Sequence, residues 1–134
     1  MKKFVFKLQP VLVMRLQLEQ QALQELGITT RAYQQTLSWL KAVKQETAQA
    51  GLMPLAIEYE QQREKYLLRL RIRTAELSYQ LKLQAEDMHK ARAAAAKAQA
   101  ERKAVERLRE RRMSEWRIEM GREEDRDLAE VGSR

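Results

Sequence analysis

Positions spaced alternately three and four residues apart are mostly apolar along two long stretches of the chain. In the first stretch they are Leu12, Leu16, Glu19, Leu23, Leu26, Thr30, Tyr33, Leu37, Leu40, Lys44 and Thr47. In the second they are Ala56, Glu60, Arg63, Leu67, Leu70, Thr74, Leu77, Leu81, Gln84, Met88, Ala91, Ala95 and Ala98. This spacing predicts two helices, each with one apolar stripe, and it is the heptad pattern of a left-handed coiled coil.

The stretch QAGLMPL, residues 49–55, separates the two apolar stripes. Gly51 is a natural helix C-cap, and Pro54 suits the first turn of a new helix. The sequence therefore predicts an all-α fold of two long helices in an antiparallel coiled-coil hairpin, with a longer second helix that ends in a C-terminal overhang. We expect one domain over residues 1–134, with helix 1 at about 10–48, the turn at 49–54 and helix 2 at about 55–130.

A turn near residues 51–52 also predicts the register of the hairpin. Facing residues then have numbers that add up to about 103 or 104, so that Leu26 faces Leu77. The polar members of the two stripes coincide in this register, as when Thr30 faces Thr74. Matching polar layers would fix the register, because a slip would set a polar group against leucine.

The opening residues KKFVFKLQPVLVMR allow three interpretations: a signal peptide, a β-strand or the leader of helix 1. A signal peptide needs an uninterrupted apolar run of about 7–15 residues, and Lys7, Gln9 and Pro10 interrupt this one. A membrane span needs about 20 mainly apolar residues, and the sequence contains no such run. We therefore expect a cytoplasmic protein whose opening residues lead into helix 1 and face the alanine-rich residues 90–100.

The predicted second helix continues past the last residue that helix 1 can pair with, at about residue 100. Residues 102–117 hold seven basic and three acidic side chains, a net charge of +4. We expect the apolar side chains of this overhang to remain uncovered: Val105, Leu108, Trp116 and Met120. An amphipathic helix with a basic face and a few large apolar residues is typical of a partner-binding element.

Composition agrees with a coiled coil and excludes most site chemistry. Charged residues make up 34% of the 134 residues and aromatic residues only 6%, which favours long helices over a globular core. The chain has no cysteine and one histidine, His89, and it has no Gly-rich phosphate loop. We expect no catalytic residue, no cofactor, no metal and no small-molecule ligand, and hence no enzyme.

The net charge of +7 suits an acidic partner, and nucleic acid is one candidate. The 26 basic residues are mixed with 19 acidic ones, however, and no aromatic platform for bases is interleaved with them. A basic coiled coil that binds nucleic acid is therefore the least favoured of the functions that we consider, and we expect no nucleic acid partner.

The opening residues carry a resemblance to a known family. Phe4-x-Phe6-x-Leu8, followed by Arg15 and Glu19, resembles the start of the FliJ family of flagellar type III export proteins. Tyr66-Leu67-x-x-Leu70, early in helix 2, and the acidic residues 123–130 are similar to further features of that family.

The resemblance implies a non-enzymatic component of the flagellar type III protein export apparatus. It would act as a central stalk that binds the hexameric export ATPase and couples it to the export-gate membrane protein and the export chaperones, at the inner membrane. The residues implied at the ATPase-facing tip are Phe4, Phe6, Leu8, Arg102, Arg109, Arg112 and Trp116. Those implied at the gate are Tyr66, Leu67 and Leu70. The alternatives are an export chaperone or adaptor, or the equivalent stalk protein of an injectisome.

Overall fold

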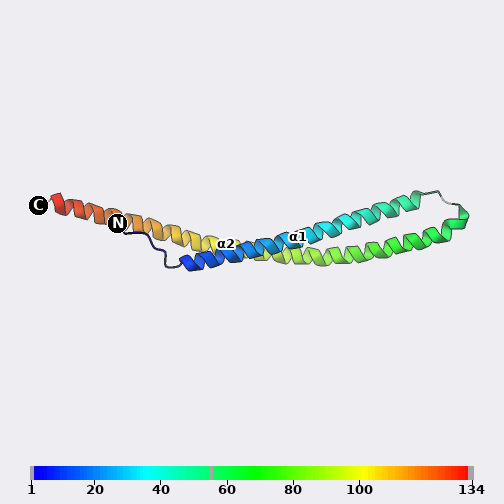
Figure 1. Cartoon of the computed structure of the whole chain (residues 1–134), viewed down its shortest axis with the longest axis horizontal. Helices are drawn as coiled ribbons and strands as arrows, with labels where there is room; N and C mark the ends of the chain where they lie inside the picture. The colour runs from blue at the N-terminus through cyan, green and yellow to red at the C-terminus, as the bar shows by residue number, and fades with distance from the viewer. Residues whose placement is uncertain (1, 55, 133–134) are drawn as a thin grey trace. The chain divides into compact units, whose positions relative to one another are not determined.

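The computed structural model of the protein describes residues 2–54 and 56–132, and these residues form two long helices (Figure 1). Helix α1 runs from Gln9–Leu52, a 3-10 turn η1 from Ile57–Tyr59, and helix α2 from Glu60–Gly132. No strand occurs in the described part of the chain. The predicted fold class is confirmed, since the protein is all-α, with two helices packed against each other and a longer second helix.

The chain forms two compact units, and both helices contribute to each of them. Unit 1 comprises Met1–Ala22 and Ala95–Arg134, and unit 2 comprises Leu23–Ala94. The division of the chain into a single coiled-coil domain stays a prediction. Each unit is described below on its own.

The connection between the helices in unit 2 differs from the predicted turn. Gly51 lies inside α1 rather than at a left-handed C-cap, and no described glycine has a positive φ. Helix α1 ends at Leu52 because Pro54 disfavours the helical conformation of the residue before it, Met53. The prediction that Pro54 opens the second helix is wrong, since α2 begins only at Glu60. The predicted first residue of helix 2, Leu55, lies outside the described residues.

An arginine of α2 takes over the role expected of a C-cap. The Arg63 guanidinium donates a hydrogen bond to the carbonyl oxygen of Gly51, in the last turn of α1. A cation at the C-terminus of a helix satisfies a carbonyl that has no partner within the helix and complements the helix dipole. Arg63 also lies 3.6 Å from Glu60, in the first turn of α2.

Two contacts across unit 2 define the observed register. Arg63 pairs with Gly51, and Tyr66 interacts with Glu46. Facing residues thus have numbers that add up to between 112 and 114.

The predicted register, with sums of 103 or 104, is therefore wrong. Leu77 lies level with Thr36, not with Leu26, a displacement of about ten residues or about 15 Å along α1. The error comes from the position of the turn. Its centre lies at about residue 56 rather than at residues 51–52, and each residue by which the centre moves changes the sum of facing numbers by two.

The apolar stripe predicted for the second helix is confirmed in unit 2. From Arg63 to Ala91, its positions are all half-buried or buried, and Leu77 is fully buried. On α1 the predicted stripe holds from Leu26 to Leu40, beyond which Val43 is half-buried and Lys44 is exposed. The core of unit 2 consists of Thr36, Leu40, Leu70, Leu77 and Ala91.

In unit 1 the opening residues lead into α1, as predicted, but the prediction that they face the alanine-rich residues 90–100 is wrong, because they contact α2 between Leu108 and Glu123. Residues 2–6 are irregular and residues 7–8 form a turn, so this leader (residues 2–8) does not belong to α1. Pro10 lies in the first turn of α1, where its missing N–H costs nothing. The leader runs beside α2 instead of continuing the helix (Figure 1).

The overhang predicted for the longer second helix is present, but its apolar side chains are not uncovered as the sequence analysis expected. Val105, Leu108, Trp116 and Met120 are all half-buried. The leader reaches Glu123, which forms an ion pair of 3.6 Å with Lys2. A chain that leaves the helical conformation advances about 3.3 Å per residue rather than 1.5 Å, and so a few residues cover several turns of α2.

Candidate functional site

The leader alternates between buried and exposed side chains. Phe4 is half-buried and Phe6 is 8% exposed, whereas Val5 between them is 77% exposed and Lys7 is exposed. A period of two is that of an extended chain with one side against a surface. The strand-like spacing of Phe4 and Phe6 is thus realised without a sheet, because the surface that receives it is a helix, whereas Leu8 lies in the turn before α1 and is 41% exposed.

The receiving surface of α2 repeats every seven residues. Arg109, Trp116 and Glu123 are two helical turns apart and share one face of α2. The Arg109 guanidinium lies 5.7 Å from the centre of the Phe4 ring, and the Phe4 and Trp116 rings are 6.0 Å apart and tilted by 56°. Both distances fall in the range of favourable cation–π and aromatic contacts. Phe4 therefore anchors the leader between two side chains of α2.

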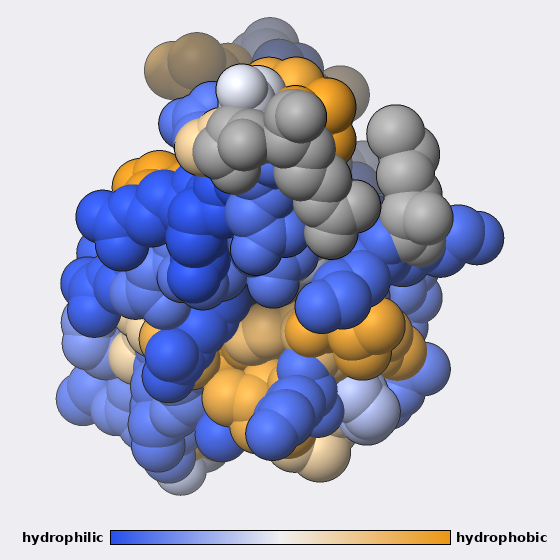
Figure 2. All heavy atoms as spheres, turned by 90° about the vertical axis from the view of Figure 1, so that its left-hand side faces the viewer, coloured by the Kyte–Doolittle hydropathy of each residue, from blue (hydrophilic) through white to orange (hydrophobic). Residues whose placement is uncertain are grey.

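A groove of about 460 Å³ lies between the leader and α2. Its lining residues are Phe4, Val5, Phe6, Lys7, Leu8, Leu108, Arg112 and Trp116. Figure 2, which looks toward the end of the molecule where α2 ends, shows apolar surface exposed between hydrophilic side chains. Five of the seven residues predicted for an ATPase-facing tip line this groove, and a sixth, Arg109, contacts one of its walls.

The seventh, Arg102, is engaged within the protein. Its guanidinium donates hydrogen bonds to the Glu19 carboxylate, at 2.6 and 3.2 Å, and to Glu106, at 2.7 Å. Arg102 and Glu19 are largely buried, with side chains 17% and 14% exposed. Nearby, Arg15 donates to Glu101 at 2.7 Å, so two ion pairs join α1 to α2 in unit 1.

This ion-pair network shifts the ionisation of its members. The hydrogen bond from Arg102 lowers the pKa of Glu19 despite the opposing effect of burial, and the positive charges of Arg102 and Lys103 lower it further. The two carboxylates in turn raise the pKa of Arg102, which stays charged. In the predicted register, with sums of 103 or 104, Glu19 would face Gln84, and so the sequence did not indicate Arg102 as its partner.

The residues predicted for the gate contact lie in unit 2 with different exposures. Leu70 is 8% exposed and belongs to the core, and Leu67 is half-buried. Tyr66 is 37% exposed; burial of its hydroxyl raises its pKa, and the nearby Glu46 carboxylate raises it further. Their common function as a partner site stays a prediction.

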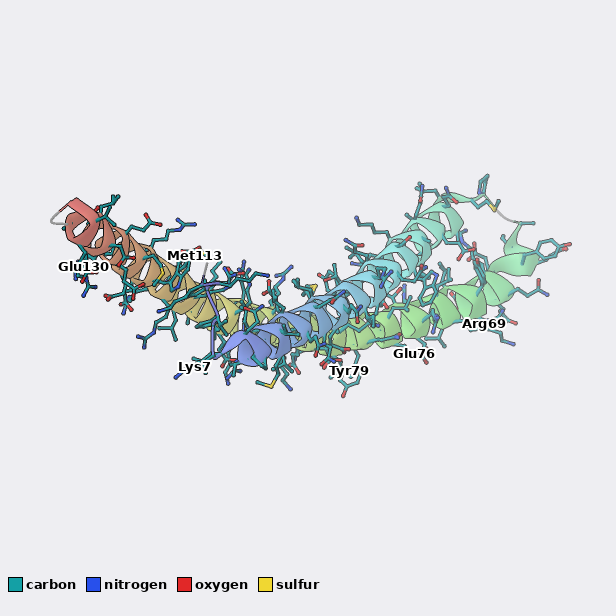
Figure 3. The ribbon with its side chains drawn as sticks, turned by 60° about the vertical axis from the view of Figure 1, so that its left-hand side comes forward. Lys7, Arg69, Glu76, Tyr79, Met113 and Glu130 are labelled. Atoms are coloured by element: carbon teal, nitrogen blue, oxygen red, sulfur yellow. The ribbon has the colours of Figure 1, made fainter. Side chains whose placement is uncertain are left out.

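An exposed apolar stripe of α2 was missed by the sequence analysis. Leu68, Ile72, Tyr79 and Leu83 are between 44% and 66% exposed, and their spacing of four, seven and four residues places them on one face of the helix. Tyr79 projects from α2 into solvent, as does Arg69 beside the stripe (Figure 3). The spacing of these residues is a second heptad pattern in the sequence, next to the one that forms the core, and it could have predicted the stripe.

Other kinds of site find no support in the described residues. No group of three or more His, Asp or Glu side chains that could hold a metal ion occurs among them. None of the described helices has a stretch long and apolar enough to cross a membrane.

Comparison with known proteins identifies the family. The family model described as flagellar FliJ protein matches residues 3–134, which is nearly the whole chain. No curated protein and no solved structure matches the chain. The match agrees with the resemblance of the opening residues and with the helical fold. The chain therefore belongs to the FliJ family and is a coiled-coil protein associated with flagellar type III protein export.

Proposed function

We propose that this protein is a non-catalytic stalk of the flagellar export ATPase and that unit 1 is the part that contacts the ATPase ring. The observation that carries the proposal is the gathering of Phe4, Arg109, Arg112 and Trp116 around one face of α2. Large aromatic side chains and arginines are the residues that concentrate binding energy at protein interfaces.

The helical pair suits this role physically. Helices held by a heptad core and by cross-helix ion pairs resist bending and rotation, so they can transmit a force between partners. The role requires no reaction chemistry of the stalk, because hydrolysis takes place in the ATPase. Exposed guanidinium groups on α2, at Arg111, Arg112 and Arg117, can pair with carboxylates of the ring.

The direct test is the turnover of the cognate export ATPase with and without this protein. We expect the protein to raise turnover or ring assembly. Combined replacement of Arg111, Arg112 and Arg117 by Glu should abolish the effect, and Trp116→Ala should reduce it strongly. No change in turnover or assembly with the wild-type protein would refute the proposal.

A matched charge-reversal variant in unit 2 controls for net charge. Arg69, Arg71 and Arg92 are exposed arginines outside the proposed contact. Their combined replacement by Glu changes the net charge as much as the triple variant of unit 1 does. We expect this control to stimulate the ATPase like the wild type, at low and at high salt.

A second contact, with the export gate, is proposed for unit 2. The supporting observation is the exposed stripe of Leu68, Ile72, Tyr79 and Leu83, since a row of large apolar side chains on a helix is a typical partner surface. Tyr79→Ala should weaken capture of the gate protein's cytoplasmic domain and leave ATPase stimulation unchanged. Loss of both activities together would contradict two separate contacts.

The proposal also places the protein at the cytoplasmic face of the inner membrane, beside the gate, and includes export chaperones among its partners. Co-purification from cells that assemble flagella tests these points together. The ATPase should appear in the eluate of the wild type and decrease in that of the Trp116→Ala variant. Recovery of chaperones alone, without the ATPase, would favour an adaptor rather than a stalk.

A further inference from the structure

We propose that the groove between the leader and α2 binds an acidic partner segment that inserts apolar side chains between carboxylates. This inference deepens the proposed function, on which it rests for the biological partner, by naming the chemistry that unit 1 recognises. The groove itself, its walls and its charge are properties of this chain.

The walls of the groove fit apolar side chains. Phe4, Phe6, Leu108 and Trp116 supply them, and Phe4 and Trp116 are fixed by their mutual contact. The volume of about 460 Å³ lies within the range of sites that hold small ligands, about 300–1,000 Å³. It accommodates a few side chains of a peptide but not a folded domain. The occupant is therefore a short segment.

The charged side chains of the groove select an acidic occupant. Among the described lining residues, the charged ones are Lys7 and Arg112, and both are cationic. Arg112 also forms an ion pair with Glu115, but at 3.5 Å and with both side chains more than half exposed. Such a surface pair contributes little, so a carboxylate of the occupant can replace Glu115 at small cost.

A net positive charge on both sides of the groove adds to this selection. The leader carries three lysines, Lys2, Lys3 and Lys7, and the α2 segment that it spans, residues 108–123, holds five basic and four acidic side chains, a net charge of +1. The ion pair of Lys2 with Glu123 is mostly exposed and compensates only part of this charge. The contacts of Phe4 with Trp116 and Arg109 hold the leader on α2. Carboxylates of the occupant are attracted by the cations of both sides.

Two exposed apolar residues of the groove, Val5 and Leu8, are left for the occupant to cover. Val5 is 77% exposed although it lines the groove, because the period of two turns it away from α2. An apolar side chain of the occupant would cover Val5 and desolvate the neighbouring cations, which strengthens their pairing with carboxylates. Specificity thus requires both features in one segment: apolar side chains for the walls and carboxylates for Lys7 and Arg112.

Trp116 provides a direct assay in the full-length protein. The chain has two tryptophans, and the other one, Trp39, lies in unit 2, so the Trp39→Phe variant has Trp116 as its only indole. The probe is the synthetic peptide EDFELFDE with both ends blocked, which contains neither Trp nor Tyr. We expect a saturable change of the Trp116 emission on titration. The isosteric amide peptide QNFQLFNQ should bind at least about tenfold more weakly.

Variants test each part of the groove. Arg112→Glu should lower the affinity for the acidic peptide at least about tenfold, because attraction becomes repulsion. Deletion of residues 2–8 removes one wall and should abolish saturable binding while circular dichroism still reports the helices. Arg71→Glu, an exposed reversal in unit 2, should leave the affinity unchanged.

Four outcomes would overturn the proposal. The first is the absence of a saturable signal with the acidic peptide, and the second is equal affinity for the amide peptide. The third is tighter binding of the acidic peptide after deletion of residues 2–8. The fourth is a response of the Trp116 emission to vesicles of phosphatidylglycerol but not to the peptide. The third would mean that the leader only covers the α2 face, and the fourth that the basic leader meets a membrane. The peptide titration contains no ATPase, so its result does not depend on the turnover assay. Either proposal can therefore fail while the other stands.

Discussion

The register of the two helices in unit 2 can be tested with one pair of introduced cysteines. The chain has no cysteine of its own, so Thr36→Cys combined with Leu77→Cys gives a protein with two thiols. Both positions are at most 1% exposed and lie level with each other in the observed register. We expect this variant to form an intramolecular disulfide on mild oxidation.

The matched control keeps Leu77→Cys and moves the other thiol to Leu26→Cys. Position 26 lies about ten residues, or about 15 Å, from the level of Leu77 along α1. A disulfide requires Cα atoms no more than about 7 Å apart, so the control pair should remain reduced. The difference of about 15 Å far exceeds what local breathing of a helix can supply.

Two measurements score the result. Mass spectrometry of the monomer detects the loss of two hydrogens, and thermal unfolding with and without reductant measures the gain in stability. A crosslink that closes a loop of about 40 residues should stabilise by about 4 kcal/mol relative to the reduced form. Rapid oxidation of the 26/77 pair together with slow oxidation of the 36/77 pair would refute the observed register and restore the one expected from a turn at Gly51.

Three further outcomes follow from burial, charge and helix propensity. Leu70→Ala should lower the free energy of unfolding by about 2–4 kcal/mol, whereas Leu68→Ala, on the same helix but 56% exposed, should lower it by less than about 1 kcal/mol. Chemical denaturation measures both values, and equal effects would contradict the placement of the core. Because Arg102 lowers the pKa of Glu19 below its ordinary value of about 4.5, this pair contributes stability above that pH and loses it as the pH falls through the lowered pKa. The difference in melting temperature between the wild type and Glu19→Gln should therefore be constant above about pH 5 and shrink below about pH 4; a constant difference across the whole range would argue against the pairing. Gly27→Ala should raise stability by about 0.5–1 kcal/mol, because the added methyl group meets only the tip of a flexible arginine, and a loss of stability would show that the site is more crowded than described.

Sequence periodicity predicted the helices and one of their faces but not how the faces meet. The stripe on α2 from Arg63 to Ala91 follows from the heptad alone, because burial on a helix repeats with the helical turn. The register depends on where the turn is centred, and both Gly51 and Pro54 allow more than one arrangement. A glycine can remain helical, and a proline can lie in a loop. The contact of Arg63 with Gly51 indicates the register, and no local sequence pattern predicts that these two residues pair.

The candidate site was predictable as a set of residues and not as a shape. Phe4, Arg112 and Trp116 were among the residues that the resemblance to the FliJ family implied at one tip of the protein. That they line a common groove depends on the path of the extended leader along α2, and the sequence analysis had expected the opening residues to face residues 90–100 instead. An extended segment on a helix satisfies the same alternation. Arg102 was chosen for its charge, but its neighbours Glu19 and Glu106 engage it within the fold.

The packing of an extended leader along a helix has a consequence for how members of this family can differ in length. Two residues added to the leader extend its cover by about 7 Å, a little more than one helical turn, so growth of one segment requires growth of the other in a ratio of about one to two. An insertion of one to three residues in α2 between Arg109 and Trp116 would instead rotate these two side chains apart by about 100° per residue, so that Phe4 could no longer contact both. Sequence divergence at this end of the protein should therefore conserve a length ratio and a helical phase even where the identities of the residues change.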